Sequence, residues 1–181
     1  LGGGLTHARF EARRMEIERL LQAGQLPQAH QAAQQLLADS QEPGSQVSAY
    51  NQAMAFDLLG AVLYAGGAAG EALPHFREAQ RRFEQLGEQG AHMAAATLSE
   101  QGDCLRDLGR LDEAVKMIDE GIERFEGLED KRSVTSSKER LATVHMLQGR
   151  YAEALAAYEA AKQNFAELGE PQSVATIWHQ I

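Results

Sequence analysis

LSEQGDCLRDLGRLDEAVKMIDEG, residues 98–121, is the stretch that decides the fold of this 181-residue chain. On both sides of Leu108-Gly109-Arg110, apolar residues recur at steps of three and four residues. This spacing is typical of amphipathic helices. Gly109 suits the left-handed backbone that often ends a helix. The stretch therefore predicts a helix, a tight turn and a second helix.

The same pattern returns at a regular interval along the chain. Its most constant member is an alanine of the second helix, found at Ala72, Ala114 and Ala154, so the interval is 42 residues (114 − 72) and then 40 (154 − 114). A weaker copy is anchored at Ala29, 43 residues (72 − 29) before Ala72, and residues 174–181 match the opening of one more first helix. Repeats of this length indicate stacked helix pairs, because one pair cannot bury its apolar face alone.

Small residues accompany each copy at two kinds of position. One kind lies in the first helix, where a small side chain would let the paired helices approach closely, at Gly60, Gly102 and Ala142. The other kind lies at the breaks, where glycine would take a left-handed conformation. These glycines are Gly24, Gly66, Gly67, Gly70, Gly109 and Gly149 between paired helices, with Gly87 and Gly169 after second helices.

We expect an all-α fold, a right-handed superhelical solenoid of antiparallel helix pairs joined by short turns. The expected helices are 6–23, 26–39, 46–66, 70–86, 89–108, 111–127, 131–148, 151–168 and 172–181. They group into units at about 6–44, 45–88, 89–130 and 131–170, with the first helix of a fifth unit at 171–181. Residues 1–5 are expected to be a tail or an expression remnant, and an end inside a unit indicates a fragment of a longer protein.

Charge and cysteine content narrow the classes of partner and site. Asp and Glu number 26 against 17 Lys and Arg, a net charge of −9. Because this charge repels phosphates and anionic lipid surfaces, we expect no nucleic-acid or membrane partner. Cys104 has no second cysteine to pair with, and no histidine lies at metal-binding spacing, so neither a disulfide, a metal site nor a cofactor is expected. A cytoplasmic location fits this composition.

These features resemble the tetratricopeptide repeat family over roughly residues 10–181. That family places a large residue, Leu-Gly and a bulky residue in the first helix, and Ala, an aromatic residue and Ala in the second. In the second unit these are Phe56, Leu59, Gly60, Leu63, Ala72, Phe76 and Ala79. The common unit has about 34 residues. The units here have 40–43, which is similar to the longer-unit members found in kinesin light chains and bacterial peptide-sensing regulators.

The resemblance implies that the first helix of each unit lines a concave inner groove. The groove residues that it implies are Arg14, Glu18, Met54, Asp57, Ala61, Tyr64, Ser99, Asp103, Arg106, Glu139, Thr143 and Met146. With Glu11 and Asp107, six carboxylates share this face with two arginines. We therefore expect a mildly acidic groove that prefers a partly basic or apolar peptide. The alternative interpretation is that these residues are ordinary solvated helix faces.

Three functions are compatible with the sequence. The favoured one is a non-catalytic scaffold that binds a protein or peptide in the groove. The second is a sensor or autoinhibitory arm of a larger bacterial regulator or signalling ATPase. The third is an enzyme with a site in the groove, although no nucleophile–base set or phosphate loop supports it. Self-association through the C-terminal end, at Trp178 and Ile181, is a further expectation.

Two single residues have structural interpretations. Cys104 adjoins the packing residue Leu105 and is expected to be a buried structural thiol rather than a reactive one. His145 stands where Leu63 and Leu105 stand in the preceding units, so we expect it to pack between helices.

Overall fold

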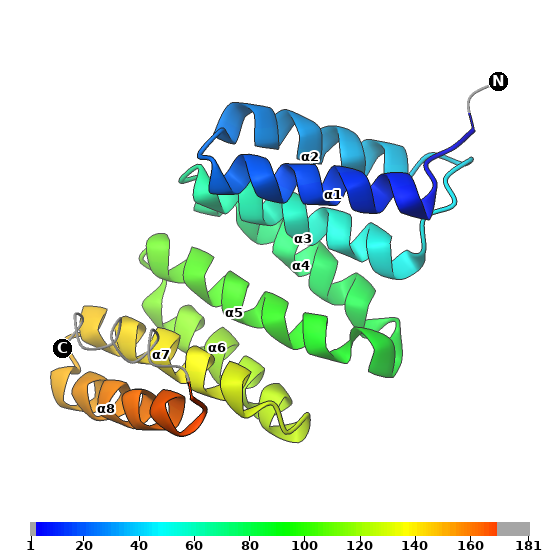
Figure 1. Cartoon of the computed structure of the whole chain (residues 1–181). Helices are drawn as coiled ribbons and strands as arrows, with labels where there is room; N and C mark the ends of the chain where they lie inside the picture. Colours follow the sequence, from blue (N-terminus) through cyan, green and yellow to red (C-terminus); the bar gives the residue numbers. More distant parts are fainter. Residues whose placement is uncertain (1–2, 170–181) are drawn as a thin grey trace. The chain divides into compact units, whose positions relative to one another are not determined.

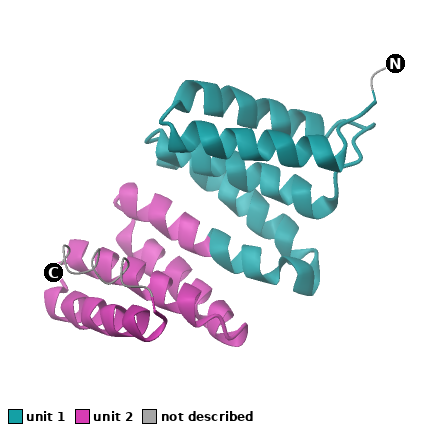
Figure 2. Cartoon of the chain, in the orientation of Figure 1, with its two compact units in different colours: residues 1–97 teal, residues 98–181 magenta. Residues whose placement is uncertain are grey.

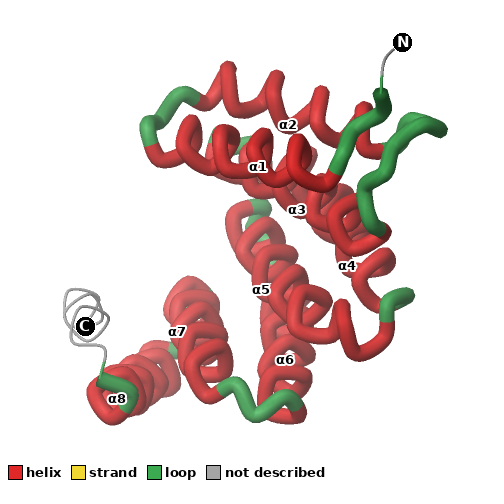
Figure 3. Tube along the Cα trace, turned by 45° about the vertical axis from the view of Figure 1, so that its right-hand side comes forward, coloured by secondary structure: helices red, strands yellow, loops and turns green. Residues whose placement is uncertain are grey.

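The computed structural model describes residues 3–169, and these form eight α-helices and one short 3-10 helix (Figure 1). The helices are α1 (His7–Gln22), α2 (Leu26–Ser40), α3 (Ala49–Ala65), α4 (Ala69–Glu84), η1 (Gly87–Gly90), α5 (Ala91–Asp107), α6 (Leu111–Gly127), α7 (Lys131–Leu147) and α8 (Tyr151–Glu167). No strand occurs within these residues, and short turns reverse the chain between paired helices (Figure 3). The predicted all-α fold of paired helices is confirmed. The helix expected at 172–181 lies outside the described residues.

The chain divides into two compact units, residues 1–97 and 98–181 (Figure 2). The first unit holds α1 to α4, η1 and the start of α5, and the second holds the rest of α5 with α6, α7 and α8. Each of the four expected repeat ranges contains one helix pair. A single solenoid over residues 6–181 and its right-handed superhelix stay predictions.

Helix ends agree with the expected ranges to within three residues, and the largest difference is at the start of α3. The sequence pattern placed that start at residue 46. In the structure Gln46 still lies outside the helix, and its backbone N–H donates to the carbonyl oxygen of Leu5 (2.9 Å). The helix begins after Ser48, whose Oγ accepts from the backbone N–H of Asn51 (3.1 Å). Ser48 is therefore the N-cap, a signal that the apolar spacing alone did not reveal.

The small residues of the first helices lie where paired helices cross, as predicted. A Cβ atom added to Gly60 would stand 2.8 Å from Cε1 of Phe76, and one added to Gly102 would stand 2.5 Å from Cγ1 of Ile118. Ala142, at the third such position, is buried in one core cluster with Tyr158. Each small residue therefore leaves the space that a large residue of the partner helix fills.

Of the six glycines predicted to be left-handed between paired helices, four end the first helices in that conformation, whereas Gly66 has a φ of −80° and Gly70 lies inside α4. The φ angles of these four are 72° for Gly24, 80° for Gly67, 76° for Gly109 and 79° for Gly149. After the second helices, Gly87 and Gly169 have φ angles of 63° and 75°. The residue at the matching place in the third pair is Glu129, which has a φ of 57° and is the one non-glycine with positive φ among residues 3–169.

Replacing Glu129 with glycine is expected to raise the free energy of unfolding. The left-handed conformation costs an L-residue about 1–2 kcal/mol, and glycine adopts it freely. After the greater chain entropy of unfolded glycine is subtracted, we expect Glu129→Gly to gain about 0.5–1 kcal/mol in urea denaturation. Glu129→Ala is the matched control, because it removes the carboxylate but keeps the Cβ. Equal stability of the two variants would show that the backbone at residue 129 is not strained.

Candidate functional site

In the first unit, the expected binding residues of α1 form a closed ion-pair cluster. Nη2 of Arg14 donates to Oε2 of Glu11 (2.8 Å), and its Nη1 donates to Oε1 of Glu18 (2.6 Å). Both partners lie one helical turn away, so helix geometry brings the three side chains together. The hydrogen bond to Glu11, assisted by the charge of Glu18, raises the pKa of Arg14. The cluster keeps one net negative charge, and its arginine is already engaged.

On α3, the expected residues share one face but differ in exposure. Asp57 is buried, with 9% of its surface exposed. Met54, Ala61 and Tyr64 are half-buried. A ligand on this part of α3 would therefore contact the thioether of Met54 and the ring of Tyr64 more than the carboxylate of Asp57.

In the second unit, Asp103 on α5 is the centre of a network of ion pairs. Its Oδ1 lies 3.2 Å from Nη1 of Arg106, and its Oδ2 lies 3.5 Å from Nε of Arg140 on α7. Arg106 also contacts Oδ1 of Asp107 (3.1 Å). The side chain of Asp103 is 14% exposed, and burial raises its pKa although Arg140 and Arg106 oppose the rise. Because the carboxylate binds two guanidinium groups, it is a structural link between the two helices.

Arg140 is the residue that the sequence analysis missed at this site. With Arg140 included, the face carries three carboxylates, from Asp103, Asp107 and Glu139, and two guanidinium groups. Its net charge is therefore −1 and not the −2 that Arg106 alone would leave. The ion pair joins residues 37 positions apart (140 − 103), and no local spacing rule predicts which residues of successive repeats meet.

Ser99 and Thr143 have their hydroxyl groups turned to internal partners. Ser99 is 2% exposed, and its Oγ lies 3.1 Å from Oγ of the equally buried Ser137. The hydroxyls of Thr143 and Tyr158 lie 2.7 Å apart. This burial leaves Ser99 without surface for a ligand, so we treat it as a packing residue. Glu139 and Arg106 remain half-buried, and Met146 is 37% exposed.

The side chains of Cys104 and His145 lie in the interior or at its edge. Cys104 is fully buried, and its burial, with the charge of Asp103, raises the pKa of the thiol to about 12. A thiol with this pKa is protonated near neutral pH and is a poor nucleophile. His145 is half-buried, and its Nδ1 lies 3.0 Å from Oε1 of Gln148.

Among residues 3–169, no three His, Cys, Asp or Glu side chains lie close enough together to hold a metal ion. No helix there has both the length and the hydropathy that crossing a membrane requires.

Comparison with protein families supports the repeat pattern. Two family models described as tetratricopeptide repeat match the sequence, one over residues 50–127 and the other over residues 99–168. Together they span residues 50–168, which is 119 of 181 residues. A search of curated proteins found no match.

Several solved structures share the fold at low sequence identity. A putative kinesin light chain of Podosopora anserina with nearly identical TPR-like repeats has a TM-score of 0.71 and 16% identity, and the match covers 94% of this chain and 86% of that one. A STAND protein of Pyrococcus horikoshii with a tetratricopeptide repeat sensor has a TM-score of 0.80 and 14% identity, with 93% and 26% covered. The Rap conjugation gene regulator of plasmid pLS20, in complex with a Phr peptide, has a TM-score of 0.75 and 14% identity, with 94% and 51% covered. The chain therefore spans about half of the plasmid regulator and about a quarter of the STAND protein.

Proposed function

Because the chain belongs to the tetratricopeptide repeat family, we propose that it is a non-catalytic scaffold that binds a protein or an extended peptide. The observation that carries the proposal is the placement of polar and apolar side chains along the first helices of the repeats. Met54 and Tyr64 lie half-buried on α3, and Glu139 and Met146 reach the surface of α7. The peptide complex of the structurally similar plasmid regulator supports this class of ligand.

The chemistry of the partner follows from the charged side chains on the first helices of each unit. In the first unit, Glu11, Glu18 and Asp57 outnumber Arg14, and in the second the three carboxylates outnumber Arg106 and Arg140 by one. Met54, Tyr64 and Met146 add apolar surface. We therefore propose a partner segment that presents both basic and apolar side chains. Among these first-helix side chains the net charge is −2 in the first unit and −1 in the second, which favours a partner that is only partly basic.

Removing two groove carboxylates is expected to weaken binding of the partner. We expect Glu18→Gln combined with Glu139→Gln to lower affinity about five- to tenfold, because each charge that solvent still reaches at an interface contributes about 1 kcal/mol or less. Calorimetric titration with the partner captured by the natural protein would measure the loss, and high salt should reduce it. Because burial raises the pKa of Glu139, its neutral replacement removes a desolvation cost and should leave the fold intact.

The matched control is Glu153→Gln on α8, a second helix, whose carboxylate pairs with Arg150 at 2.8 Å. It changes the net charge in the same direction but leaves the first-helix faces untouched. Equal affinities of the double variant, the control and the unchanged protein would reject the first-helix faces as the binding surface. Weaker binding in the double variant alone, of a partner with both basic and apolar side chains, would support the first-helix faces as the binding surface.

The similarity to a STAND protein with a tetratricopeptide repeat sensor favours a second candidate function. In this alternative, the chain is a sensor or autoinhibitory arm of a larger bacterial regulator or signalling ATPase. The natural gene product would decide between the scaffold and the sensor or autoinhibitory arm. An adjoining nucleotide-binding or DNA-binding domain would support the second function, and a product without such a domain would contradict it.

A cytoplasmic location and self-association through residues 171–181 stay predictions. Light scattering would test the self-association.

A further inference from the structure

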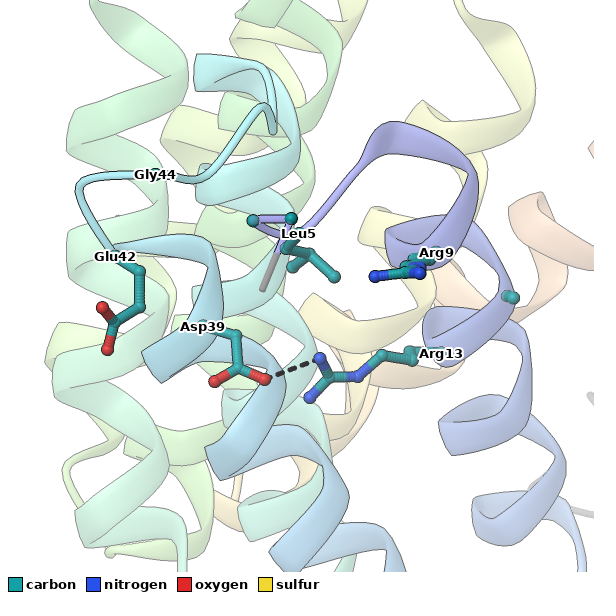
Figure 4. A pocket seen from close by; sticks show the side chains of 9 residues that line it. Leu5, Arg9, Arg13, Asp39, Glu42 and Gly44 are labelled. Atoms are coloured by element: carbon teal, nitrogen blue, oxygen red, sulfur yellow. Dashed lines mark hydrogen bonds and ion pairs between the residues drawn. The ribbon is translucent and has the colours of Figure 1, made fainter. Parts of the chain in front are cut away.

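A cavity of about 530 Å³ opens at the end of the first unit where α1 begins and α2 ends (Figure 4). Its walls come from residues 3–5, the first turns of α1, the end of α2 and the loop that follows α2. The residues that matter for its chemistry are Leu5, Arg9, Arg13, Asp39, Glu42 and Gly44. Its volume lies in the range of sites for small ligands, about 300–1,000 Å³.

Backbone contacts hold the walls of the cavity together. A Cβ atom on Gly4 would overlap the carbonyl oxygen of Gly44, so the two glycine backbones pack directly on each other. The hydrogen bond from Gln46 to the carbonyl of Leu5 (2.9 Å) joins the same two segments. Leu5 is thereby buried and presents an apolar wall, and the glycines leave the rim without side chains.

The two arginines of the cavity differ in whether their guanidinium group is paired with a carboxylate. Nη1 of Arg13 binds Oδ2 of Asp39 at 2.7 Å, and Gln35 donates to the other carboxylate oxygen at 2.8 Å. Each oxygen of Asp39 therefore accepts a hydrogen bond, and these bonds outweigh the effect of burial and lower its pKa. The guanidinium group of Arg9 points toward Leu5 and has no partner within residues 3–169 (Figure 4). The carboxylate of Glu42 points away from both arginines (Figure 4).

We propose that this cavity binds a carboxylate monoanion with an adjoining small apolar group, either a free acid or the carboxyl end of a peptide. Arg9 offers an uncompensated charge and paired N–H donors that match a carboxylate. The N–H groups of Arg13 that Asp39 does not use offer further donors, and Leu5 lies beside them for the apolar group. One uncompensated guanidinium beside two carboxylates favours a single negative charge over the double charge of a phosphate. The site goes beyond the proposed scaffold function, because its arginines, Arg9 and Arg13, lie on α1 but are not among the expected groove residues of that helix.

Titration of the ¹⁵N-labelled protein with N-acetyl-leucine, followed by NMR, tests the site. We expect the amide signals of Leu5, Arg9 and Gly44 to shift, and we expect N-acetyl-leucinamide, which lacks the charge, to bind at least about tenfold more weakly. Arg9→Gln should weaken binding of N-acetyl-leucine by about tenfold or more. The matched control is Arg19→Gln, an exposed arginine of the same helix that pairs with Glu16 at 2.6 Å and should leave binding unchanged.

Two further probes separate the possible sources of the ligand. A pentapeptide that ends in leucine with a free carboxyl group, compared with its C-terminal amide, reports on peptide ends. Tighter binding of the free-carboxyl peptide than of N-acetyl-leucine supports a peptide end, and equal binding supports a free acid. The proposal is overturned if the amides bind as well as the acids, if Arg9→Gln has no effect, if inorganic phosphate binds more tightly than N-acetyl-leucine, or if no probe shifts these signals.

Discussion

Gly90→Ala is expected to lower the free energy of unfolding by about 3 kcal/mol, the upper part of the range for overpacked sites. Gly90 ends η1 and is buried where the chain leaves α4 and enters α5. A Cβ atom there would overlap the carbonyl oxygen of Phe83 and stand 2.7 Å from its carbonyl carbon. The clash is with backbone, which no change of rotamer can relieve. Urea denaturation followed by circular dichroism would measure the loss.

The control for this prediction is Gly66→Ala in the same unit. Gly66 has a φ of −80°, and its added Cβ would meet no atom closer than 3.5 Å, which is an ordinary contact. We expect its stability to change by no more than about 0.5 kcal/mol, as for substitutions without a named mechanism. Indistinguishable midpoints for the two variants would mean that η1 is not held against α4 as tightly as the structure shows.

Gly102→Leu is expected to cost about 3 kcal/mol of stability, and truncating the opposing Ile118 should recover part of it. The Cβ of the new side chain would meet Cγ1 of Ile118 at 2.5 Å, where α5 crosses α6. Ile118→Ala alone leaves a cavity and should also cost about 3 kcal/mol. In the double variant, the new leucine occupies part of that cavity. We therefore expect a loss at least about 1.5 kcal/mol smaller than the sum of the single losses.

Ile122→Ala provides the matched comparison for this double-mutant cycle of Gly102→Leu and Ile118→Ala. Ile122 is also buried on α6, one turn after Ile118, and the three atoms nearest to a Cβ on Gly102 belong to Ile118 and Ala114 instead. Combining Ile122→Ala with Gly102→Leu should give losses closer to additive, because Ile118 and not Ile122 stands nearest to the new side chain. Additivity in both double variants would contradict the pairing of small and large residues across the helix crossing.

The helices themselves could be predicted because their signals are local. Helix α6 has the predicted bounds, since Gly109 marks the preceding turn and the apolar residues after it repeat with helical spacing. The predicted start of α3 was wrong by three residues, because the local N-cap signal of Ser48 was not used and because Gln46 bonds to Leu5, a residue 41 positions earlier (46 − 5). A contact between distant segments leaves no trace in the spacing of either segment.

The site residues were predictable only in part for the same reason. Arg14 with Glu18, and Asp103 with Arg106, lie one turn apart, so helix geometry alone brings each pair together. The contact of Asp103 with Arg140 and the burial of Ser99 against Ser137 depend on how α5 packs on α7. The family resemblance proposes a binding face, which stays a prediction, and it does not indicate the partners of each side chain on that face.

The sequence by itself determined that this chain is a run of helix pairs, because the alanines, small residues and turn glycines repeat in register and act through neighbours within a few turns. Only the tertiary structure decided which of the charged side chains are paired with residues of other helices and which remain available to a ligand. It paired Arg13 of α1 with Asp39 of α2 and Arg140 of α7 with Asp103 of α5, and it left Arg9 beside a cavity. The physical reason is that a backbone pattern needs only local geometry, whereas the state of a charge depends on every group within a few ångströms, from whatever part of the chain it comes.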